Sequence, residues 1–309
     1  MSVDLSLSLA DGRLKLKNPV TVASGTFGNG MEYDKLFDIS ALGALTTKAV
    51  TVTARQGNPG QRLVETPAGL INSIGLMNPG LEAFVQESLP WLRQKPELPL
   101  IVNISGSTVE EYALLAAALD QEPGIAALEV NISCPNVDQG GMAFGATPQA
   151  AAEVTRRVRQ STSLPIFVKL TPNVGDIKEI ALAVAAAGAD GFSLINTLLG
   201  MAIDIHKRRP TLQATFGGLS GPAIRPIALR MVYQVRQVSP LPIIGMGGIA
   251  TWQDALEFIL AGAQVVAVGT ALFSNPLAPL EIIAGLEAYC RREGVSRMQD
   301  LVAAAHGGS

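Results

Sequence analysis

The sequence predicts an α/β fold, a single (β/α)8 TIM barrel that spans residues 1–309, and two observations carry this prediction. Eight short apolar runs rich in β-forming residues recur along the chain, and stretches with helical periodicity separate them. Continuous apolar strands that alternate with helices are typical of a parallel sheet covered on both faces, and eight such units fill a closed barrel. A doubly wound open sheet is the alternative that the same pattern allows.

The runs expected to form strands are PVTVASG (19–25), ALTTKAV (44–50), PLIVNIS (99–105), ALEVNIS (127–133), PIFVKL (165–170), GFSLINT (191–197), PIIGMGGI (242–249) and VVAVGTAL (265–272). Four spacers are expected to be helices, and each opens with a Thr or Asp suited to cap a helix N-terminus: residues 108–121, 147–160, 176–188 and 251–262. We find no linker, low-complexity tract or block of like charge, so one domain is the simpler interpretation.

Composition and charge exclude several classes of partner. With 48% hydrophobic residues, the 309-residue chain can bury a sizeable core. Its net charge of -3 and pI near 5.5 leave no basic excess, so we expect no nucleic-acid partner. No stretch approaches the roughly 18 apolar residues of a membrane span, and the amino-terminal segment has no long apolar region, so we expect a soluble, cytoplasmic protein without membrane contact.

Cysteine and histidine are scarce. The only cysteines in the sequence are Cys134 and Cys290, and the only histidines are His206 and His306. The two cysteines do not form a CxxC pair. Neither a zinc site nor an iron-sulphur cluster can be assembled from these residues. The sequence therefore predicts no metal in this chain, and any cluster must lie on another chain.

In a barrel, functional residues lie at the carboxyl ends of the strands. The Gly-rich ends of the last two predicted strands, at 245–250 and 268–272, lie where such barrels commonly bind a phosphate on backbone N–H groups. The plainer interpretation is that these glycines only allow tight turns. A dinucleotide site is not favoured, because no acidic residue ends the strand that follows the G-x-G-x-x-A match.

Two lysines, Lys48 and Lys169, end otherwise apolar strands and therefore need a compensating anion. A salt bridge to Glu65 or Glu129, a Schiff base, and a substrate carboxylate or anionic cofactor are the three interpretations. Five asparagines also follow or end strands or turns: Asn72, Asn103, Asn131, Asn136 and Asn196. Each alone suits a turn, but together they offer donors and acceptors for a flat heterocycle such as a pyrimidine or an isoalloxazine.

Cys134 follows a predicted strand, within the run Asn-Ile-Ser-Cys-Pro-Asn (131–136). A lone cysteine is commonly an inert buried thiol. Here the segment that follows is rich in Gly and Pro, a composition expected of a mobile lid. A thiol without a histidine partner can still accept a proton when it is desolvated and well placed. Cys290, in the last helical stretch beside two arginines, is expected to be structural.

Seven motifs, in order along nearly the whole chain, resemble the class 1 dihydroorotate dehydrogenases, and most closely the catalytic subunit of the NAD-linked 1B branch. They are Ala23 to Gly28 (ASGTFG), Thr46 to Lys48 (TTK), Asn72 to Leu76 (NSIGL), Asn131 to Asn136 (NISCPN), Val168 to Asn173 (VKLTPN), Ile195 to Thr197 (INT) and Gly217 to Gly221 (GGLSG). Arg225 departs from the family, where a lysine is frequent, but it lies on an expected helix face.

The resemblance implies oxidation of (S)-dihydroorotate to orotate on FMN, a step of de novo pyrimidine (UMP) biosynthesis. Cys134 is then the catalytic base, which takes the C5 proton while the C6 hydride passes to flavin N5. The implied substrate-binding residues are Lys48, Asn72, Ser73, Ile74, Gly75, Leu76, Asn131, Asn196 and Thr197. The implied FMN-binding residues are Ser24, Thr47, Lys48, Asn103, Asn131, Lys169, Ile195, Gly221, Gly247, Gly248, Gly269 and Thr270, with the last four around the phosphate.

The 1B resemblance also implies partners. A second, iron-sulphur flavoprotein subunit with FAD and a [2Fe-2S] cluster would reduce NAD, in a heterotetramer of two catalytic and two electron-transfer chains built on a catalytic-chain homodimer. Residues 138–145 and 200–204 look like the 1B pattern. The alternatives are a fumarate-dependent 1A homodimer, a Schiff-base aldolase that uses Lys169, a barrel dehydrogenase with a cysteine nucleophile, and a non-catalytic electron-transfer subunit.

Overall fold

The computed structural model describes residues 3–132 and 144–307. Its centre is an eight-stranded parallel sheet in the order β3-β16-β15-β10-β9-β8-β7-β4. The strands are β3 (Val20–Val22), β4 (Leu45–Thr46), β7 (Leu100–Ile104), β8 (Ile125–Asn131), β9 (Ile166–Lys169), β10 (Gly191–Leu194), β15 (Ile243–Met246) and β16 (Val265–Val268). Each coincides with one of the eight predicted runs, although β8 begins two residues earlier than expected.

The two end strands of this sheet, β3 and β4, meet and close it into a barrel. The Gly43 N–H donates to the Val20 carbonyl at 2.8 Å, and the Thr21 hydroxyl donates to the Ala44 carbonyl at 3.0 Å. The hydroxyl oxygens of Thr21 and Thr46 lie 3.4 Å apart across the same seam. The barrel prediction is therefore confirmed, and the open-sheet alternative is wrong.

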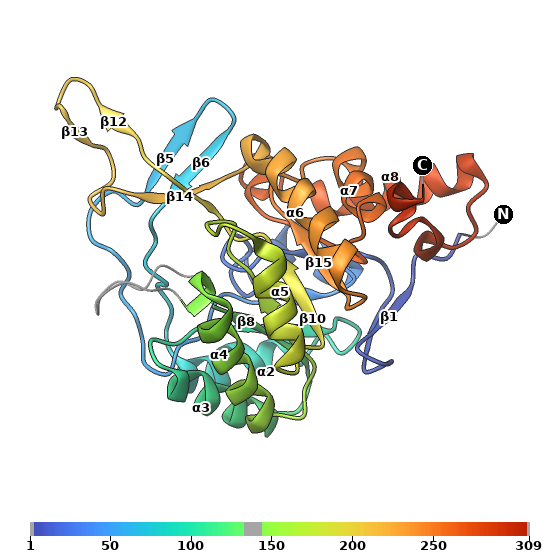
Figure 1. Ribbon diagram of the computed structural model, residues 1–309, viewed down its shortest axis with the longest axis horizontal. Helices are drawn as coiled ribbons and strands as arrows, with labels where there is room; N and C mark the ends of the chain where they lie inside the picture. The colour runs from blue at the N-terminus through green and yellow to red at the C-terminus, as the bar shows by residue number, and fades with distance from the viewer. Residues whose placement is uncertain (1–2, 133–143, 308–309) are drawn as a thin grey trace.

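Helices cover the outside of the barrel (Figure 1). The longer ones are α3 (Val109–Asp120), α4 (Pro148–Ser161), α5 (Ile177–Ala186), α6 (Arg225–Val238), α7 (Trp252–Leu260) and α8 (Ala278–Glu293). Two short helices, α1 (Leu81–Ala83) and α2 (Leu89–Leu92), flank a π-helical turn at Phe84–Ser88. Single 3-10 turns occupy Tyr33–Lys35, Ile39–Ala41, Phe144–Ala146, Pro222–Ile224, Thr270–Phe273, Met298–Leu301 and Ala304–His306.

The four predicted helices begin at the residues that the sequence marks as caps. The side chains of Thr108, Thr147, Asp176 and Thr251 each accept a hydrogen bond from a backbone N–H in the first turn of α3, α4, α5 and α7, respectively. In α7 the cap is reciprocal, because Asp254 also accepts from the backbone N–H of Thr251 at 3.0 Å.

Three smaller β elements were not predicted. An antiparallel hairpin, β1 (Leu7–Leu9) with β2 (Leu14–Leu16), packs its leucines against barrel-interior residues such as Ile101 and Phe167 and so plugs the amino-terminal end. A four-stranded sheet combines β5 (Leu63–Thr66), β6 (Gly69–Asn72), β14 (Gly217–Ser220) and β11 (Leu198–Gly200). A two-stranded hairpin, β12 (Ile203–Asp204) with β13 (Arg209–Pro210), extends beyond it.

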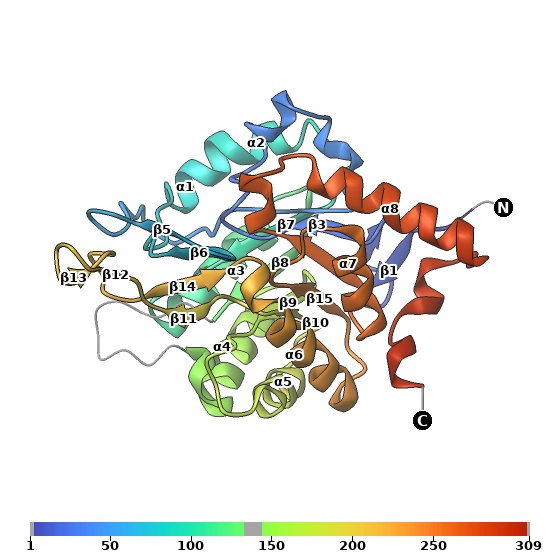
Figure 2. The same ribbon diagram turned by 90° about the horizontal axis from the view of Figure 1, so that it is seen from above.

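Both views place the four-stranded sheet on the side of the molecule opposite the two chain ends (Figure 2). Because β11 follows β10 after only a short connection, this sheet stands over the carboxyl ends of the barrel strands. The hairpin β1–β2 and the four-stranded sheet therefore mark the two ends of the barrel, and the second marks the end where a site is expected.

The barrel strands alternate between two environments. Along β8, Leu128 and Val130 belong to the outer core, which includes helix residues such as Leu115 and Val154, whereas Ala127 belongs to the inner cluster. Glu129 and Asn131 share the inward face with Ala127, because side chains two apart in a strand point the same way. The barrel interior thus changes from apolar to polar toward the carboxyl ends of the strands. Within the described residues, no helix is long and apolar enough to cross a membrane.

Candidate active site

A cavity of about 1020 Å³ opens at the carboxyl ends of the barrel strands, beneath the four-stranded sheet. Its lining comes from the segments that follow β3, β4, β9, β10, β15 and β16, and from the strands β6 and β14. A cavity of this size is sufficient for a cofactor together with a small substrate. The expectation that polar groups gather at this end of the barrel is confirmed.

Most of the predicted site residues line this one cavity, although they are spread over the whole chain. They are Ser24, Lys48, Asn72, Ser73, Ile74, Gly75, Leu76, Asn131, Lys169, Ile195, Asn196, Thr197, Gly221, Gly247, Gly248, Gly269 and Thr270. Thr47 and Asn103 are fully buried and lie outside the lining. Cys134 and Asn136 lie outside the described residues. The individual roles assigned to all of these residues stay predictions.

The Gly-rich segments form a backbone cradle at one end of the cavity. Gly221, Gly247 and Gly248 have φ angles of 95°, 123° and 79°, in the region that favours glycine. A Cβ on Gly248 would lie 2.7 Å from the Gly221 carbonyl oxygen, so the two segments pack backbone against backbone. The Thr270 hydroxyl donates to the Ser220 hydroxyl at 2.8 Å beside them. Gly-rich backbone close to the start of α6 fits a phosphate group.

Lys169 stands at the floor of the cavity and pairs with Glu129. Its Nζ lies 3.4 Å from Glu129 Oε1, and both side chains are almost completely buried. Asn103 Nδ2 donates to the same carboxylate oxygen at 2.6 Å. Of the two glutamates considered from the sequence, Glu129 is therefore the partner of Lys169. Because Lys169 also lines the cavity, its ammonium lies between the carboxylate and whatever the cavity binds.

Lys48 supplies a second cation to the cavity lining, from the turn after β4. Its backbone N–H donates to the Gly28 carbonyl at 3.0 Å and to Asn29 Oδ1 at 3.2 Å, which fixes the turn after β4. A Cβ on Gly25 would lie 3.7 Å from Lys48 Nζ, so the lysine side chain extends across the turn that follows β3. The φ of 95° at Gly25 favours glycine there.

Amide side chains from three elements converge above the lysines. Asn72 at the end of β6 donates to the Gly218 carbonyl at 3.1 Å, which ties β6 to β14. Asn196 Nδ2 lies 3.5 Å from Asn131 Oδ1, so the ends of β8 and β10 present their amides side by side. Asn173 donates to the Thr197 carbonyl at 3.1 Å. The arrangement offers both donors and acceptors, as recognition of the edge of a flat heterocycle requires.

The described residues that flank the range 133–143 lie beside the cavity. The Gly145 N–H donates to the Ile132 carbonyl at 2.8 Å, which brings the two flanks together. The Tyr112 hydroxyl, from α3, donates to the Asn131 carbonyl at 2.7 Å, and the Tyr112 and Phe144 rings meet edge to face at 5.8 Å. Both rings line the cavity, so described residues on each side of the range 133–143 lie beside it.

Several lining residues were missed by sequence reasoning. Ser105 ends a predicted strand, so its position alone was a usable signal, and its hydroxyl has no hydrogen-bond partner among the residues described. Tyr112 lies on an apolar helix face and looks like an ordinary core residue in the sequence. Arg55, Asn58 and Phe216 lie in connections whose course only the folded chain reveals.

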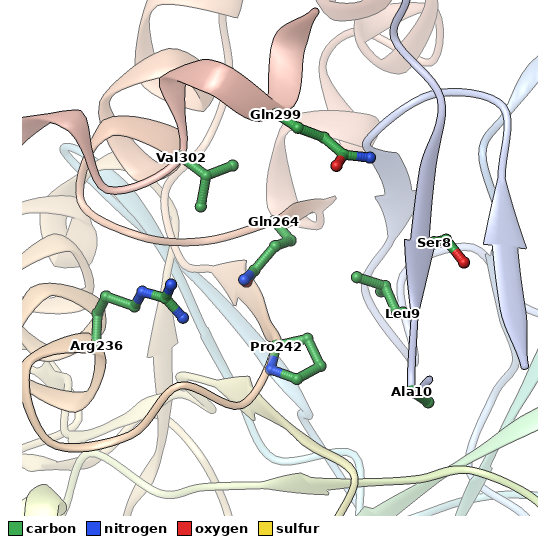
Figure 3. A pocket seen from close by; sticks show the side chains of 8 residues that line it. All are labelled: Ser8, Leu9, Ala10, Arg236, Pro242, Gln264, Gln299 and Val302. Carbon is green, nitrogen blue, oxygen red and sulfur yellow. The ribbon is translucent and has the colours of Figure 1, made fainter. Parts of the chain in front are cut away.

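A second, smaller cavity of about 350 Å³ lies near the amino-terminal end of the barrel (Figure 3). Three of its four polar side chains have hydrogen-bond partners. Arg236 donates to the Pro240 carbonyl at 3.0 Å, Gln264 accepts from the Ile243 N–H at 2.8 Å, and Gln299 donates to the Ser6 carbonyl at 2.9 Å. These bonds give the cavity a structural role at the junction of β1, α6 and the carboxyl-terminal segment.

The fold and the site together define a (β/α)8-barrel protein with a Gly-rich backbone cradle, a buried lysine and converging amides at the carboxyl ends of its strands. The family model for dihydroorotate dehydrogenase matches residues 7–289, and this chain belongs to that family. The resemblance inferred from the seven motifs is therefore confirmed.

Curated relatives match over almost their entire length, and three of them are named "Dihydroorotate dehydrogenase B (NAD(+)), catalytic subunit". The Desulforamulus reducens protein is 58% identical over 302 residues, which cover 98% of this chain and 99% of the relative. The Desulforudis audaxviator protein is 57% identical over 306 residues, with 99% of each covered. The Geobacillus kaustophilus protein is 53% identical over 289 residues, with 94% and 92% covered. The prediction that the chain is closest to the NAD-linked branch is thereby confirmed.

Proposed function

We propose that this chain oxidises dihydroorotate to orotate in pyrimidine synthesis, as the catalytic subunit of an NAD-linked enzyme. The carrying observation is that near-full-length relatives at 58% and 57% identity bear that name. The convergence of the motif residues on one cavity supports the same activity, because the cations and amides suit an anionic, imide-containing ring.

The site residues fit FMN as the cofactor. The cradle of Gly221, Gly247 and Gly248 suits its phosphate, and the buried Ser105 hydroxyl has no hydrogen-bond partner within the part of the chain that the structure describes. Lys169 would lie against the edge of the flavin ring that becomes negative on reduction. When bound, FMN supplies the hydride acceptor of the reaction.

The chain's own residues would then orient the substrate and move a proton. Lys48 would hold the substrate carboxylate, and Asn72, Asn131 and Asn196 would hold the ring edges. Cys134 would accept the proton from C5 as the hydride leaves C6, so that neither charge builds up alone. A water-poor cavity strengthens each of these interactions.

The electrons would leave through a second subunit. The relatives' names include the words "catalytic subunit", which supports a separate electron-transfer chain. We expect that chain to hold FAD and a [2Fe-2S] cluster and to reduce NAD. The heterotetramer, the catalytic-chain homodimer and the cytoplasmic location stay predictions.

An anaerobic titration tests this function. The chain is purified alone, its absorbance spectrum is examined for a bound flavin, dihydroorotate is added, and fumarate and NAD are then offered separately. We expect the flavin to bleach and neither acceptor to restore its colour. Recovery with fumarate would indicate a 1A enzyme. A bound flavin that dihydroorotate does not bleach would contradict the substrate, and a chain without flavin would contradict the cofactor.

The geometry of the site does not support the aldolase alternative. Lys169 faces a buried carboxylate, an arrangement that suits an ammonium group better than the neutral amine that a Schiff base requires. Borohydride treatment with substrate should therefore leave no adduct on the protein.

A further inference from the structure

A layer of buried polar side chains crosses the barrel directly beneath the cavity. In strand register, Asn103 of β7 lies opposite Glu129 of β8, and Ser193 of β10 lies opposite Lys169 of β9. All four side chains are almost completely buried. The inner cluster toward the amino-terminal end is apolar and includes Ile101, Ala127 and Phe167, each two residues before a member of the polar layer. Apolar side chains can therefore fill the barrel interior, and barrel closure does not require the charged side chains of the polar layer.

Glu129 is the member of this layer whose burial is energetically least favourable. One carboxylate oxygen, Oε1, accepts from Asn103 Nδ2 at 2.6 Å and lies 3.4 Å from Lys169 Nζ. The other oxygen, Oε2, has no hydrogen-bond partner among the residues that the structure describes. A buried ion pair with incomplete hydrogen bonding is weak evidence for stability, and apolar residues commonly replace such pairs without loss. The pair is better explained by a task at the adjoining cavity.

The positions of Glu129 and Lys169 relative to the cavity indicate what the ion pair does. Lys169 lines the cavity, whereas Glu129 does not, so the carboxylate acts on the cavity through the lysine. A lysine side chain has several rotatable bonds and a mobile point charge, and a carboxylate at its tip restricts where that charge can lie. Asn103 holds the carboxylate from the neighbouring strand, which explains how Asn103 can influence the site from outside the lining.

We propose that Glu129 is a positioning residue: its carboxylate fixes the Lys169 ammonium at the cavity floor, facing the ring edge of the bound flavin. This inference rests on the proposed function. It makes Glu129 an indirect determinant of how readily the flavin is reduced, because a fixed cation stabilises the negative charge of the reduced ring.

The midpoint potential of the bound flavin tests this role by its sign. In E129Q, loss of the anchored cation should lower the potential by at least the equivalent of a tenfold change in the reduction equilibrium, about 30 mV for a two-electron couple. A carboxylate that acted only through space would have the opposite effect, because its removal eases the addition of negative charge. A potential that is unchanged or raised would overturn the proposal.

Three further variants sharpen the test. K169Q should lower the potential, and E129Q/K169Q should lower it no further than K169Q, because Glu129 acts through the lysine. S193A removes a buried hydroxyl beside Lys169 without changing charge, and should leave the potential unchanged. An additional fall in the double variant would contradict the indirect role.

Folding and cofactor loading are measured in parallel. E129M, which fills the space of the glutamate with an apolar side chain, is made as an alternative to E129Q. We expect each of these variants that folds to show the same fall in midpoint potential. Thermal unfolding and fluorescence titration with FMN establish that each variant is folded and loaded. A wild-type chain without flavin would overturn the proposed function and this inference together. Wild-type flavin that dihydroorotate reduces, with unchanged potential in the Glu129 variants, would overturn the inference alone.

Discussion

Gly248 lies at a backbone position where the proposed FMN site leaves no space for a side chain. Its φ of 79° and the 2.7 Å separation between its ideal Cβ and the Gly221 oxygen leave no room for a side chain. We expect G248A to raise the dissociation constant for FMN by more than tenfold, because the cradle must open to accept the methyl group. Fluorescence titration of the apoprotein with FMN measures this change.

Gly294 provides the matched control for that variant. Its φ of 71° is similar, but nothing lies within 4 Å of its ideal Cβ, and it ends α8 away from the cavity. G294A should cost about 1 kcal/mol of stability through backbone strain alone and leave FMN affinity unchanged. Equal FMN affinities in G248A and the wild type would mean that the cradle does not hold the phosphate.

Cys134 is the proposed base, and the proposed proton transfer depends on it. C134A should slow flavin reduction by dihydroorotate by about 10² to 10⁴ while FMN stays bound, because only the proton acceptor is lost. Stopped-flow absorbance under anaerobic conditions gives the rate. C134S keeps a weaker proton acceptor, so its rate of flavin reduction should lie between those of C134A and the wild type. A wild-type rate in C134A would exclude Cys134 as the base.

At the scale of the elements, Asp120 joins the end of α3 to the turn before β9. Its carboxylate accepts from the Thr162 hydroxyl at 2.6 Å and from the Ser163 N–H at 2.6 Å. The hydrogen bond from Thr162 is the main reason that the pKa of Asp120 lies below its ordinary value. Because the folded-state pKa is the lower one, this contribution to stability is present above about pH 4 and is lost as the pH falls through the folded value.

D120N should therefore lower the free energy of unfolding by about 1 kcal/mol near neutral pH, and the difference from wild type should narrow below about pH 4. Urea unfolding at neutral and acidic pH measures both quantities. D11N, a change at an exposed aspartate in the β1–β2 turn, should have no measurable effect. A difference that persisted on acidification would contradict the assigned cause.

Some elements have local sequence signals and others do not. The caps of α3, α4, α5 and α7 were predictable, because a Thr or Asp followed by helical periodicity is a local signal. The four-stranded sheet was not, because its pairs are distant in the chain: Asn72 lies opposite Gly218. Strands of three or four residues with partly exposed side chains carry no period long enough to detect.

At the scale of the whole molecule, the closure of the barrel depends on one close approach. An ideal Cβ on Gly43 would lie 2.0 Å from the Asn18 carbonyl oxygen, directly beside the seam between β3 and β4. G43A should lower the free energy of unfolding by about 2 to 3 kcal/mol, because backbone cannot move aside as a flexible side chain can. Urea unfolding monitored by circular dichroism measures the loss.

Gly175 is the control for this whole-molecule prediction. Nothing lies within 4 Å of its ideal Cβ, and its φ is outside the left-handed region. G175A should leave stability unchanged or raise it by a few tenths of a kcal/mol by restricting the unfolded chain. Similar stabilities in G43A and G175A would show that the seam tolerates separation.

The sequence by itself determined the eight strands, the caps of four helices, the family and a set of residues that line the cavity, because each of these is encoded in short runs of neighbouring residues. Only the tertiary structure decided that Lys169 pairs with Glu129 and that Asn103 lies behind the cavity. It also brought Tyr112 from a helix to the end of β8. These contacts join residues on different strands and helices, and their distances are set by barrel closure, which no local pattern specifies.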